Sequence, residues 1–173
     1  MLDNSGWGSL ILDIFPEGPE KDSFLYSTCK ILHIELSLTF EGEPKKKFLV
    51  LIDAEEPPLF FLINTVKRGI FNNKDIPLYR SDYPAIFTNE VSYLHYLSVA
   101  DDFNFINNLP PTKEELMAIL RKDPTCLKGV LRIEDAQAVL DGIEDHPRDL
   151  NLNEEQERRI MKAFTEYIKS QEL

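Results

Sequence analysis

The stretch from Lys45 to Thr65, KKKFLVLIDAEEPPLFFLINT, decides the fold that we expect for this chain. It holds two nearly continuous apolar runs, Phe48–Ile52 and Leu59–Ile63, which are separated by an acidic segment with two prolines. Runs of this length that are rich in Val, Ile, Leu and Phe are typical of strands buried on both faces. The prolines argue against a helix because they remove backbone donors. The stretch therefore predicts a hairpin of two buried strands whose polar outer ends lie side by side.

Further strands are expected on both sides of this hairpin. Ile31–Phe40 alternates apolar and polar residues with the period of two that marks a strand with one buried face. Glu41–Pro44 then supplies a turn, so the three strands are expected to form an antiparallel meander. Other short strands are predicted at Leu10–Phe15, Phe24–Tyr26, Ile76–Tyr79, Ile86–Thr88 and Val91–Val99, with Pro77 pushing its strand toward an edge. Short strands at this spacing predict a small barrel, because a closed sheet has no exposed edge.

After Asn107 the sequence becomes helical in character. A first helix is predicted to open at Thr112, which has capping-box spacing to Glu115, and to end at Asp123. A second helix fits the apolar spacing of Ile133–Ile143, and a third is predicted to start at Asn153.

These patterns predict an α+β fold in two parts. Residues 1–109 are expected to form a small antiparallel β-barrel, with a poorly defined N-terminal extension over residues 1–25. Residues 110–173 are expected to form about three helices that pack on the barrel.

Composition sets limits on function. The chain has 173 residues and a formal net charge of −11, which argues against non-specific nucleic-acid binding. Residues 45–80, however, hold seven Lys and Arg against four Asp and Glu, a local charge of 7 − 4 = +3. A basic patch on an acidic body explains this excess, and so do lysines that keep hydrophobic strands soluble.

The location is expected to be cytoplasmic. No run of apolar residues is long enough for a membrane-spanning helix, and the N-terminus lacks the basic region of a secretory signal. Cys29 and Cys126 lie far apart in the chain, and we expect two free thiols in a reducing compartment.

Local catalytic and metal-binding motifs are absent from the sequence. The three histidines, His33, His95 and His146, are isolated from carboxylates or cysteines at ligand spacing, so no metal and no cofactor are expected. His33 lies on the polar face of its predicted strand and is expected to be exposed. His95 lies between Tyr93 and Tyr96 and is expected to be partly buried with a satisfied hydrogen bond.

Residues 46–109 resemble a known group of proteins. The order K-K-F-L-V-L-I-D, P-P-L-F-F-L-I-N-T, I-P-L and F-T-N-E-V-S-Y-L-H-Y-L-S is similar to that of PemK/MazF-like, toxin-related proteins. Members have a small SH3-like β-barrel, and many are sequence-specific endoribonucleases that cleave single-stranded mRNA without a metal. The resemblance implies an SH3-like barrel, an antitoxin or another defence component as protein partner, single-stranded RNA as a ligand, and a homodimer.

The resemblance also implies a site. The family needs a basic residue just before the second strand and a hydroxyl after the third, and these positions fall at Lys47 (or Lys46) and at Thr65. The basic group stabilises the phosphate when the RNA 2′-OH attacks it. With these residues we group the other predicted ones: Arg68 and His95 as catalytic, and Lys45, Lys46, Lys67 and Arg80 as RNA-binding.

Three functions stay open at this point. The ribonuclease members usually have Arg-Pro where this chain has Lys47-Phe48, and lysine lacks the planar fork that grips a phosphate. The chain is therefore either a divergent endoribonuclease or a non-catalytic relative that acts through protein–protein interaction in a toxin–antitoxin or phage-defence system. The third alternative is a small acidic interaction or ligand-binding domain unrelated to RNA cleavage.

Overall fold

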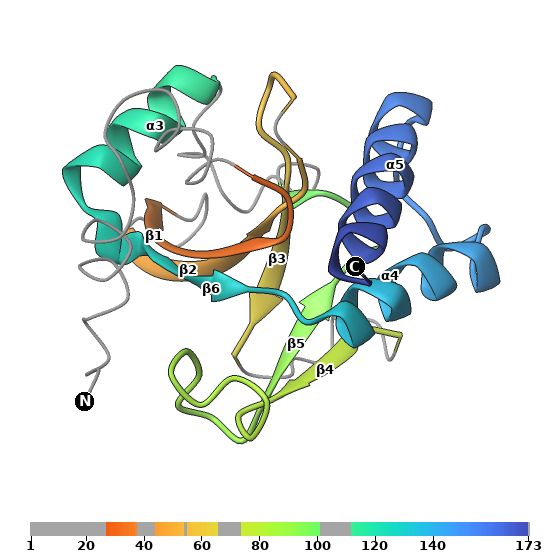
Figure 1. Cartoon of the computed structure of the whole chain (residues 1–173), viewed down its shortest axis with the longest axis horizontal. Coiled ribbons are helices and arrows are strands. Elements are labelled where there is room, and N and C mark those ends of the chain that lie inside the picture. Colours follow the sequence, from red (N-terminus) through yellow and green to blue (C-terminus); the bar gives the residue numbers. More distant parts are fainter. Residues whose placement is uncertain (1–26, 38–43, 54, 66–73, 101–111, 173) are drawn as a thin grey trace.

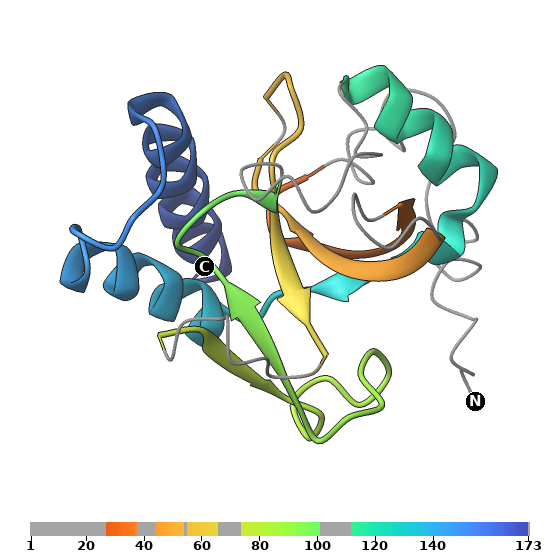
Figure 2. The same ribbon diagram turned by 180° about the vertical axis from the view of Figure 1, so that it is seen from behind.

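The computed structural model describes residues 27–37, 44–53, 55–65, 74–100 and 112–172 (Figure 1). Within them, one antiparallel sheet curls into a half-barrel, with helix α3 on one side and helices α4 and α5 on the other (Figures 1 and 2). The fold is α+β, with the C-terminal helices packed on the sheet as the sequence predicted.

The sheet has the strand order β4-β5-β3-β2-β1-β6. The strands are β1 (Lys30–Ser37), β2 (Pro44–Leu51), β3 (Phe60–Asn64), β4 (Ile76–Tyr79), β5 (Val91–His95) and β6 (Leu127–Val130). The predicted meander is confirmed, because β2 pairs with β1 on one side and with β3 on the other. Pro77 lies in the edge strand β4, where its missing N–H leaves no gap inside the sheet.

The three predicted helices are confirmed as well. They are α3 (Lys113–Lys122), α4 (Ile133–Asp145) and α5 (Glu154–Gln171), and the short 3-10 helix η2 (Pro124–Cys126) follows α3. Asn153 and Gln156 form a full capping box at α5, with N···O distances of 2.8 and 3.0 Å. At α3 the hydroxyl of Thr112 accepts a hydrogen bond from the Glu115 N–H at 3.1 Å.

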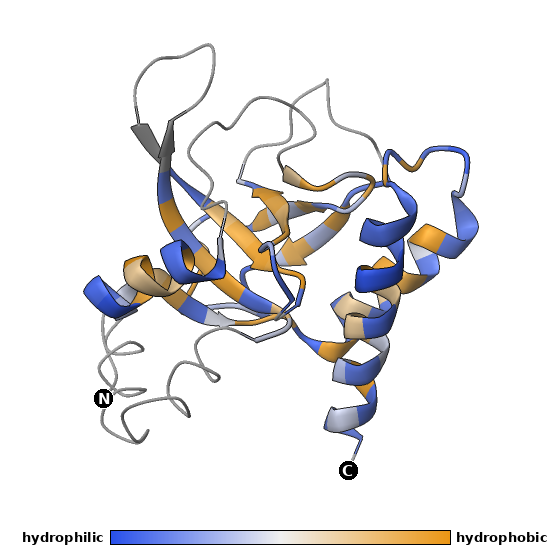
Figure 3. Ribbon diagram, turned by 90° about the horizontal axis from the view of Figure 1, so that it is seen from above, coloured by the Kyte–Doolittle hydropathy of each residue, from blue (hydrophilic) through white to orange (hydrophobic). Residues whose placement is uncertain are grey.

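The sheet is buried on both faces. Val50, Phe61 and their neighbours at alternate positions pack against α4 and α5, whereas Leu49, Leu62 and their neighbours pack against α3. All five residues of β3 are buried. In Figure 3 the hydrophobic colour accordingly gathers on the strands between the helices.

The acidic segment between β2 and β3 ties the helices to both faces. Asp53 is buried and makes a bidentate ion pair with Arg159 of α5. Glu56 accepts hydrogen bonds from the backbone N–H of Lys113, the first residue of α3, at 2.9 and 3.1 Å. A carboxylate is favourable there because the first N–H groups of a helix lack partners within the helix.

Some predicted strands differ from the structure. Ile86–Thr88 is not a strand but part of a turn, where Ile86 and Phe87 donate to the carbonyl of Tyr83 at 3.1 and 3.2 Å. The Phe87 ring is buried and contacts the rings of Tyr83 and Phe48. The apolar residue therefore anchors a turn to the core and does not belong to a strand. The strand predicted at Val91–Val99 ends already at His95.

The C-terminal segment also supplies a strand that the sequence did not predict. β6 pairs with β1 through Ile31 and Gly129, so residues 110–173 belong partly to the sheet. The described strands do not close into a full barrel, since β4 and β6 form its two edges. Both edge strands have four residues, and short edges resist pairing with other chains. The strands predicted at Leu10–Phe15 and Phe24–Tyr26 lie outside the described residues.

Candidate functional site

Three strand ends meet at one end of the sheet, next to the loop of residues 80–90: β5 begins there, while β3 and β4 end there (Figure 1). β2 runs past its last pair with β3 and begins opposite the end of β1. Phe48 and Ile63 are the last pair of the β2–β3 ladder, and beyond this pair come Lys47 and Lys46 in β2, and Asn64 and Thr65 at the end of β3. The predicted pairing of the two strands is confirmed, and it puts their polar residues at the same end of the hairpin. We call Lys46, Lys47, Asn64 and Thr65 the polar end of the sheet.

The loop of residues 80–90 joins Arg80 to this end. Arg80 donates from Nη1 to the carbonyl of Thr88 at 3.1 Å, and Asn89 donates from Nδ2 to the carbonyl of Thr65 at 2.6 Å. Because Thr88 and Asn89 are neighbours in the chain, the loop holds the Arg80 side chain and the end of β3 together. Arg80 and Thr65 are both exposed to solvent.

The alternation of side chains separates the two lysines. Phe48 and Ile63 face α4 and α5, so alternation puts Lys46 and Thr65 on that same face. Lys47 belongs to the other face, where Leu49 packs against α3. Lys46 is thus the lysine that shares a sheet face with the Thr65 hydroxyl.

Two residues of β1, Glu35 and His33, lie on the same sheet face as Lys46 and Thr65. The sequence did not single them out for a site. Glu35 lies directly opposite Lys46 in the β1–β2 ladder and is exposed. Alternation therefore puts Glu35, Lys46 and Thr65 on the same face of β1, β2 and β3, with Glu35 and Lys46 directly paired. His33, opposite Phe48, stacks on its ring with a centroid distance of 3.9 Å and an angle of 4°. The sequence could have pointed to both residues, because the alternation within β1 places Glu35 and His33 on the polar side of that strand.

His33 differs from the exposed histidine that the sequence predicted, since it is half-buried. Burial, together with the positive charges of Lys128 and Lys46, lowers its pKa to about 4. The imidazole is therefore neutral at pH 7 and carries a lone pair.

His95 lies elsewhere. It is buried, and its Nδ1 lies 2.7 Å from Oδ1 of Asp75. It pairs with Leu62, which packs against α3, so it belongs to the face opposite to Thr65. The hydrogen bond that we expected for His95 is confirmed, and the ring is buried rather than partly buried. The structure does not bring His95 together with Lys46 and Thr65.

The structure does not place the remaining predicted site residues. Lys67 and Arg68 lie outside the described residues, and so does the side chain of Lys45. In the described part of the chain, no group of three or more His, Cys, Asp or Glu could hold a metal ion. Over the same residues, no helix is long and apolar enough to cross a membrane.

The cysteines do not form a nucleophilic site. Cys29 is buried and Cys126 is half-buried, and both are free thiols. Burial raises the pKa of Cys126 to about 11 and that of Cys29 even further, so neither is a thiolate at neutral pH.

On one face of the sheet, the polar end thus offers the Lys46 ammonium and the Thr65 hydroxyl. The neighbouring strand β1 adds the Glu35 carboxylate and the neutral His33 imidazole on that face. This set can bind a phosphate and accept a proton without a metal ion. Comparison of the chain with protein-family models, with curated proteins and with solved structures found no match.

Proposed function

We propose that this protein is a PemK/MazF-like barrel protein that binds single-stranded RNA across the polar end of its sheet and cleaves it as a metal-independent endoribonuclease. The observation that carries the proposal is the row of Glu35, Lys46 and Thr65 on one face of three neighbouring strands. Metal-free RNA cleavage needs a proton acceptor and donors to the phosphate, and this row contains both.

Each member of the row has a role in the proposed reaction. The Glu35 carboxylate takes the proton from the 2′-OH as the 2′ oxygen bonds to the adjacent phosphorus. The Lys46 ammonium and the Thr65 hydroxyl donate to the non-bridging oxygens, where negative charge grows in the transition state. The bond from phosphorus to the 5′ oxygen breaks, and this oxygen takes up a proton from water. The products are a 2′,3′-cyclic phosphate and a 5′-hydroxyl.

Arg80 supports the RNA next to this row. Its Nη1 is already engaged by the carbonyl of Thr88, which orients the guanidinium while its other N–H groups remain able to donate to a second phosphate. Arg80 and Lys46 are both exposed, and their positive charges stand out in a chain of net charge −11. A local positive charge on an otherwise acidic protein favours binding of an anionic ligand such as RNA at that one site.

A second candidate is a non-catalytic relative that acts through a protein partner. The observation that favours it is the lysine at the phosphate position, because lysine binds a phosphate as a point charge without the bidentate fork of arginine. In both cases we place the protein in the cytoplasm, with an antitoxin or another defence component as its partner.

The test is cleavage of a single-stranded RNA in the presence of EDTA, with product ends identified by mass spectrometry. We expect 2′,3′-cyclic phosphate ends from the wild-type protein and a loss of about 100-fold in rate for Lys46→Ala and for Glu35→Gln, the magnitude typical of removing one catalytic donor or base. Lys162→Ala, on the exposed side of α5, is the matched control and keeps the full rate.

Intact RNA after incubation with the folded wild-type protein would refute the endoribonuclease. Intact RNA together with a stoichiometric protein partner, recovered from a lysate of the native host, would favour the second candidate instead. A rate that Lys46→Ala leaves unchanged would place the chemistry away from the polar end.

A further inference from the structure

Lys128 is a lysine at the edge of the sheet that has no role in the proposed reaction. In the β1–β6 ladder, Gly129 pairs with Ile31 and Leu127 pairs with Leu32, so Lys128 is the extra residue of a bulge. A bulge leaves one residue unpaired and re-aims its side chain. Leu127 and Gly129 are buried, whereas Lys128 is only half-buried and reaches solvent.

The charges of Lys128 and Lys46 meet at His33. Burial, then Lys128 and then Lys46 lower the pKa of His33 to about 4. Burial raises the pKa of the Cys126 thiol to about 11, and the charges that act against this rise are again those of Lys46 and Lys128. Such effects weaken with distance and with exposure to solvent. Lys128 therefore lies on the β6 side of His33, as Lys46 lies on its β2 side.

Both lysines keep their positive charge available. Among the described residues, neither ammonium has a salt-bridge partner, although Glu35 lies opposite Lys46 in the ladder. The nearby Asp123 carboxylate is occupied by the turn that follows α3, where it accepts from the Thr125 N–H at 3.2 Å. The lysine pair, Lys46 and Lys128, thus stands out in a chain of net charge −11.

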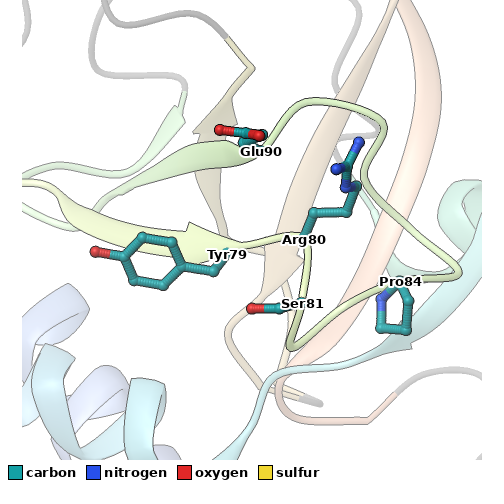
Figure 4. Close-up of a pocket in the computed structure, with 5 residues that line it drawn as sticks. All are labelled: Tyr79, Arg80, Ser81, Pro84 and Glu90. Carbon is teal, nitrogen blue, oxygen red and sulfur yellow. The ribbon is translucent and has the colours of Figure 1, made fainter.

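The loop of residues 80–90 borders the same face of the sheet. The Phe87 ring packs edge-on against Phe48, with centroids 5.1 Å apart, and His33 stacks on the Phe48 ring. Figure 4 shows Arg80 directed toward the inside of this loop and away from Tyr79. The cations of the loop, of β2 and of β6 are therefore spread across the sheet, which suits an extended polyanion and not a single small anion.

We propose that Lys128 binds a phosphate of the RNA strand next to the one held at Lys46, so that the strand crosses the sheet from β3 over β1 to β6. This inference rests on the proposed function and extends its binding surface. Because β1 separates β2 from β6, the backbones that carry the two lysines are roughly 10 Å apart, twice the spacing of neighbouring strands. Two positions this far apart suit two phosphates along one strand.

The experiment measures how salt affects the binding of a 2′-O-methyl oligouridine, which cannot be cleaved, by fluorescence anisotropy at neutral pH. Each phosphate contact adds about 0.7 to the slope of log K against log salt concentration for a single strand. We expect Lys128→Ala to reduce this slope by about 0.7 and to weaken binding about fivefold at about 0.1 M salt. The neutral His33 adds nothing to the slope. Lys162→Ala removes the same charge from the exposed side of α5 and is expected to keep the wild-type slope.

A second measurement tests the geometry without RNA. The pKa of His33 is followed by NMR in the wild-type protein and in the same two variants. Lys128→Ala is expected to raise this pKa, because one of the two positive charges near the imidazole is lost. Lys162→Ala is expected to leave it unchanged.

The possible failures are distinguishable. If Lys128→Ala keeps the wild-type salt slope while Lys46→Ala reduces it, the role of Lys128 is refuted and the proposed function stands. The role of Lys128 is equally refuted if Lys162→Ala reduces the slope as much, or if the pKa of His33 does not respond to Lys128→Ala. If the wild-type protein does not bind the oligonucleotide, the proposed function fails and this inference fails with it. Circular dichroism of each variant confirms that a loss of binding does not come from unfolding.

Discussion

Replacing Arg159 by methionine is expected to destabilise this protein strongly. The side chains of Arg159 and Asp53 are only 3% and 7% exposed. The guanidinium donates to both carboxylate oxygens, with Nε 2.8 Å from Oδ2, and to the carbonyl of Glu55 at 3.1 Å. These bonds join α5 to the turn between β2 and β3, two segments that are 106 residues apart in the chain.

The magnitude follows from what the substitution leaves behind. Methionine keeps most of the aliphatic stem of Arg159, so little packing is lost, but Asp53 stays buried as a charge without its partner. Removing one partner of a buried pair costs about 3–5 kcal/mol. Since 1 kcal/mol shifts the melting temperature of a domain of this size by about 2–4 °C, we expect a decrease of roughly 10 °C.

The assay is urea unfolding followed by circular dichroism of Arg159→Met and of three matched variants: Arg158→Met, Asp53→Asn, and the double variant Asp53→Asn, Arg159→Met. Arg158→Met changes the neighbouring arginine, whose ion pairs with Glu55 and Glu155 are exposed, and it is expected to leave the midpoint nearly unchanged. In the double variant Asp53→Asn, Arg159→Met the buried charge is gone, and Asn can still accept from the Glu55 N–H through the oxygen that now does so at 3.1 Å. We therefore expect the double variant to recover part of the loss.

Two results would refute this reasoning. One is an Arg159→Met protein that is no less stable than Arg158→Met. The other is a double variant whose loss equals the sum of the two single losses, because additivity would mean that the two side chains do not interact.

Three further predictions concern packing, pH and thiol chemistry. Gly142→Ala is expected to destabilise by about 1–3 kcal/mol in urea unfolding, because the new methyl group would lie 2.5 Å from Cζ of the buried Tyr96; a more stable variant would contradict this packing. Burial lowers the pKa of His33 from 6.5 to about 4, so between these values the folded state binds fewer protons than the unfolded state and stability falls as the pH decreases. His33→Gln is expected to flatten the stability profile in this window, and profiles of equal slope would refute the assignment. At about pH 8 iodoacetamide is expected to modify neither Cys29 nor Cys126 quickly in the folded protein, whereas rapid labelling before unfolding would show that the thiols are not protected.

The hairpin and the helices could be predicted because their signals are local. The apolar runs Phe48–Ile52 and Leu59–Ile63 have strand length and no helical period, and they are β2 and β3 in the structure. The caps of α3 and α5 involve residues three positions apart, so Thr112 and Asn153 mark the helix starts within a short window. Ile86–Thr88 was predicted wrongly, because an apolar residue in a buried turn has the same local pattern as one in a strand.

The candidate site was predictable only as far as it depends on neighbours in the chain. That the polar residues of β2 and β3 lie at the same end of the hairpin follows from a short connection, and the structure confirms the pairing of the two strands. Which lysine faces Thr65 depends on the register of that hairpin, and a shift of one residue would exchange Lys46 for Lys47. Glu35 reaches the same row through the pairing of β1, which no local pattern relates to Thr65.

Local periodicity and turn chemistry in this sequence were enough to define a buried hairpin, a meander and three helices, two of them with a side-chain cap. The path of the chain in space decided the rest: β6 pairs with β1, Arg159 reaches Asp53, and Tyr79 stays exposed beside Glu90. The physical reason is that helix capping, turn chemistry and side-chain alternation act between near neighbours in the chain. Burial and ion pairing, in contrast, act between residues that come together only when the whole sheet and its helices have formed.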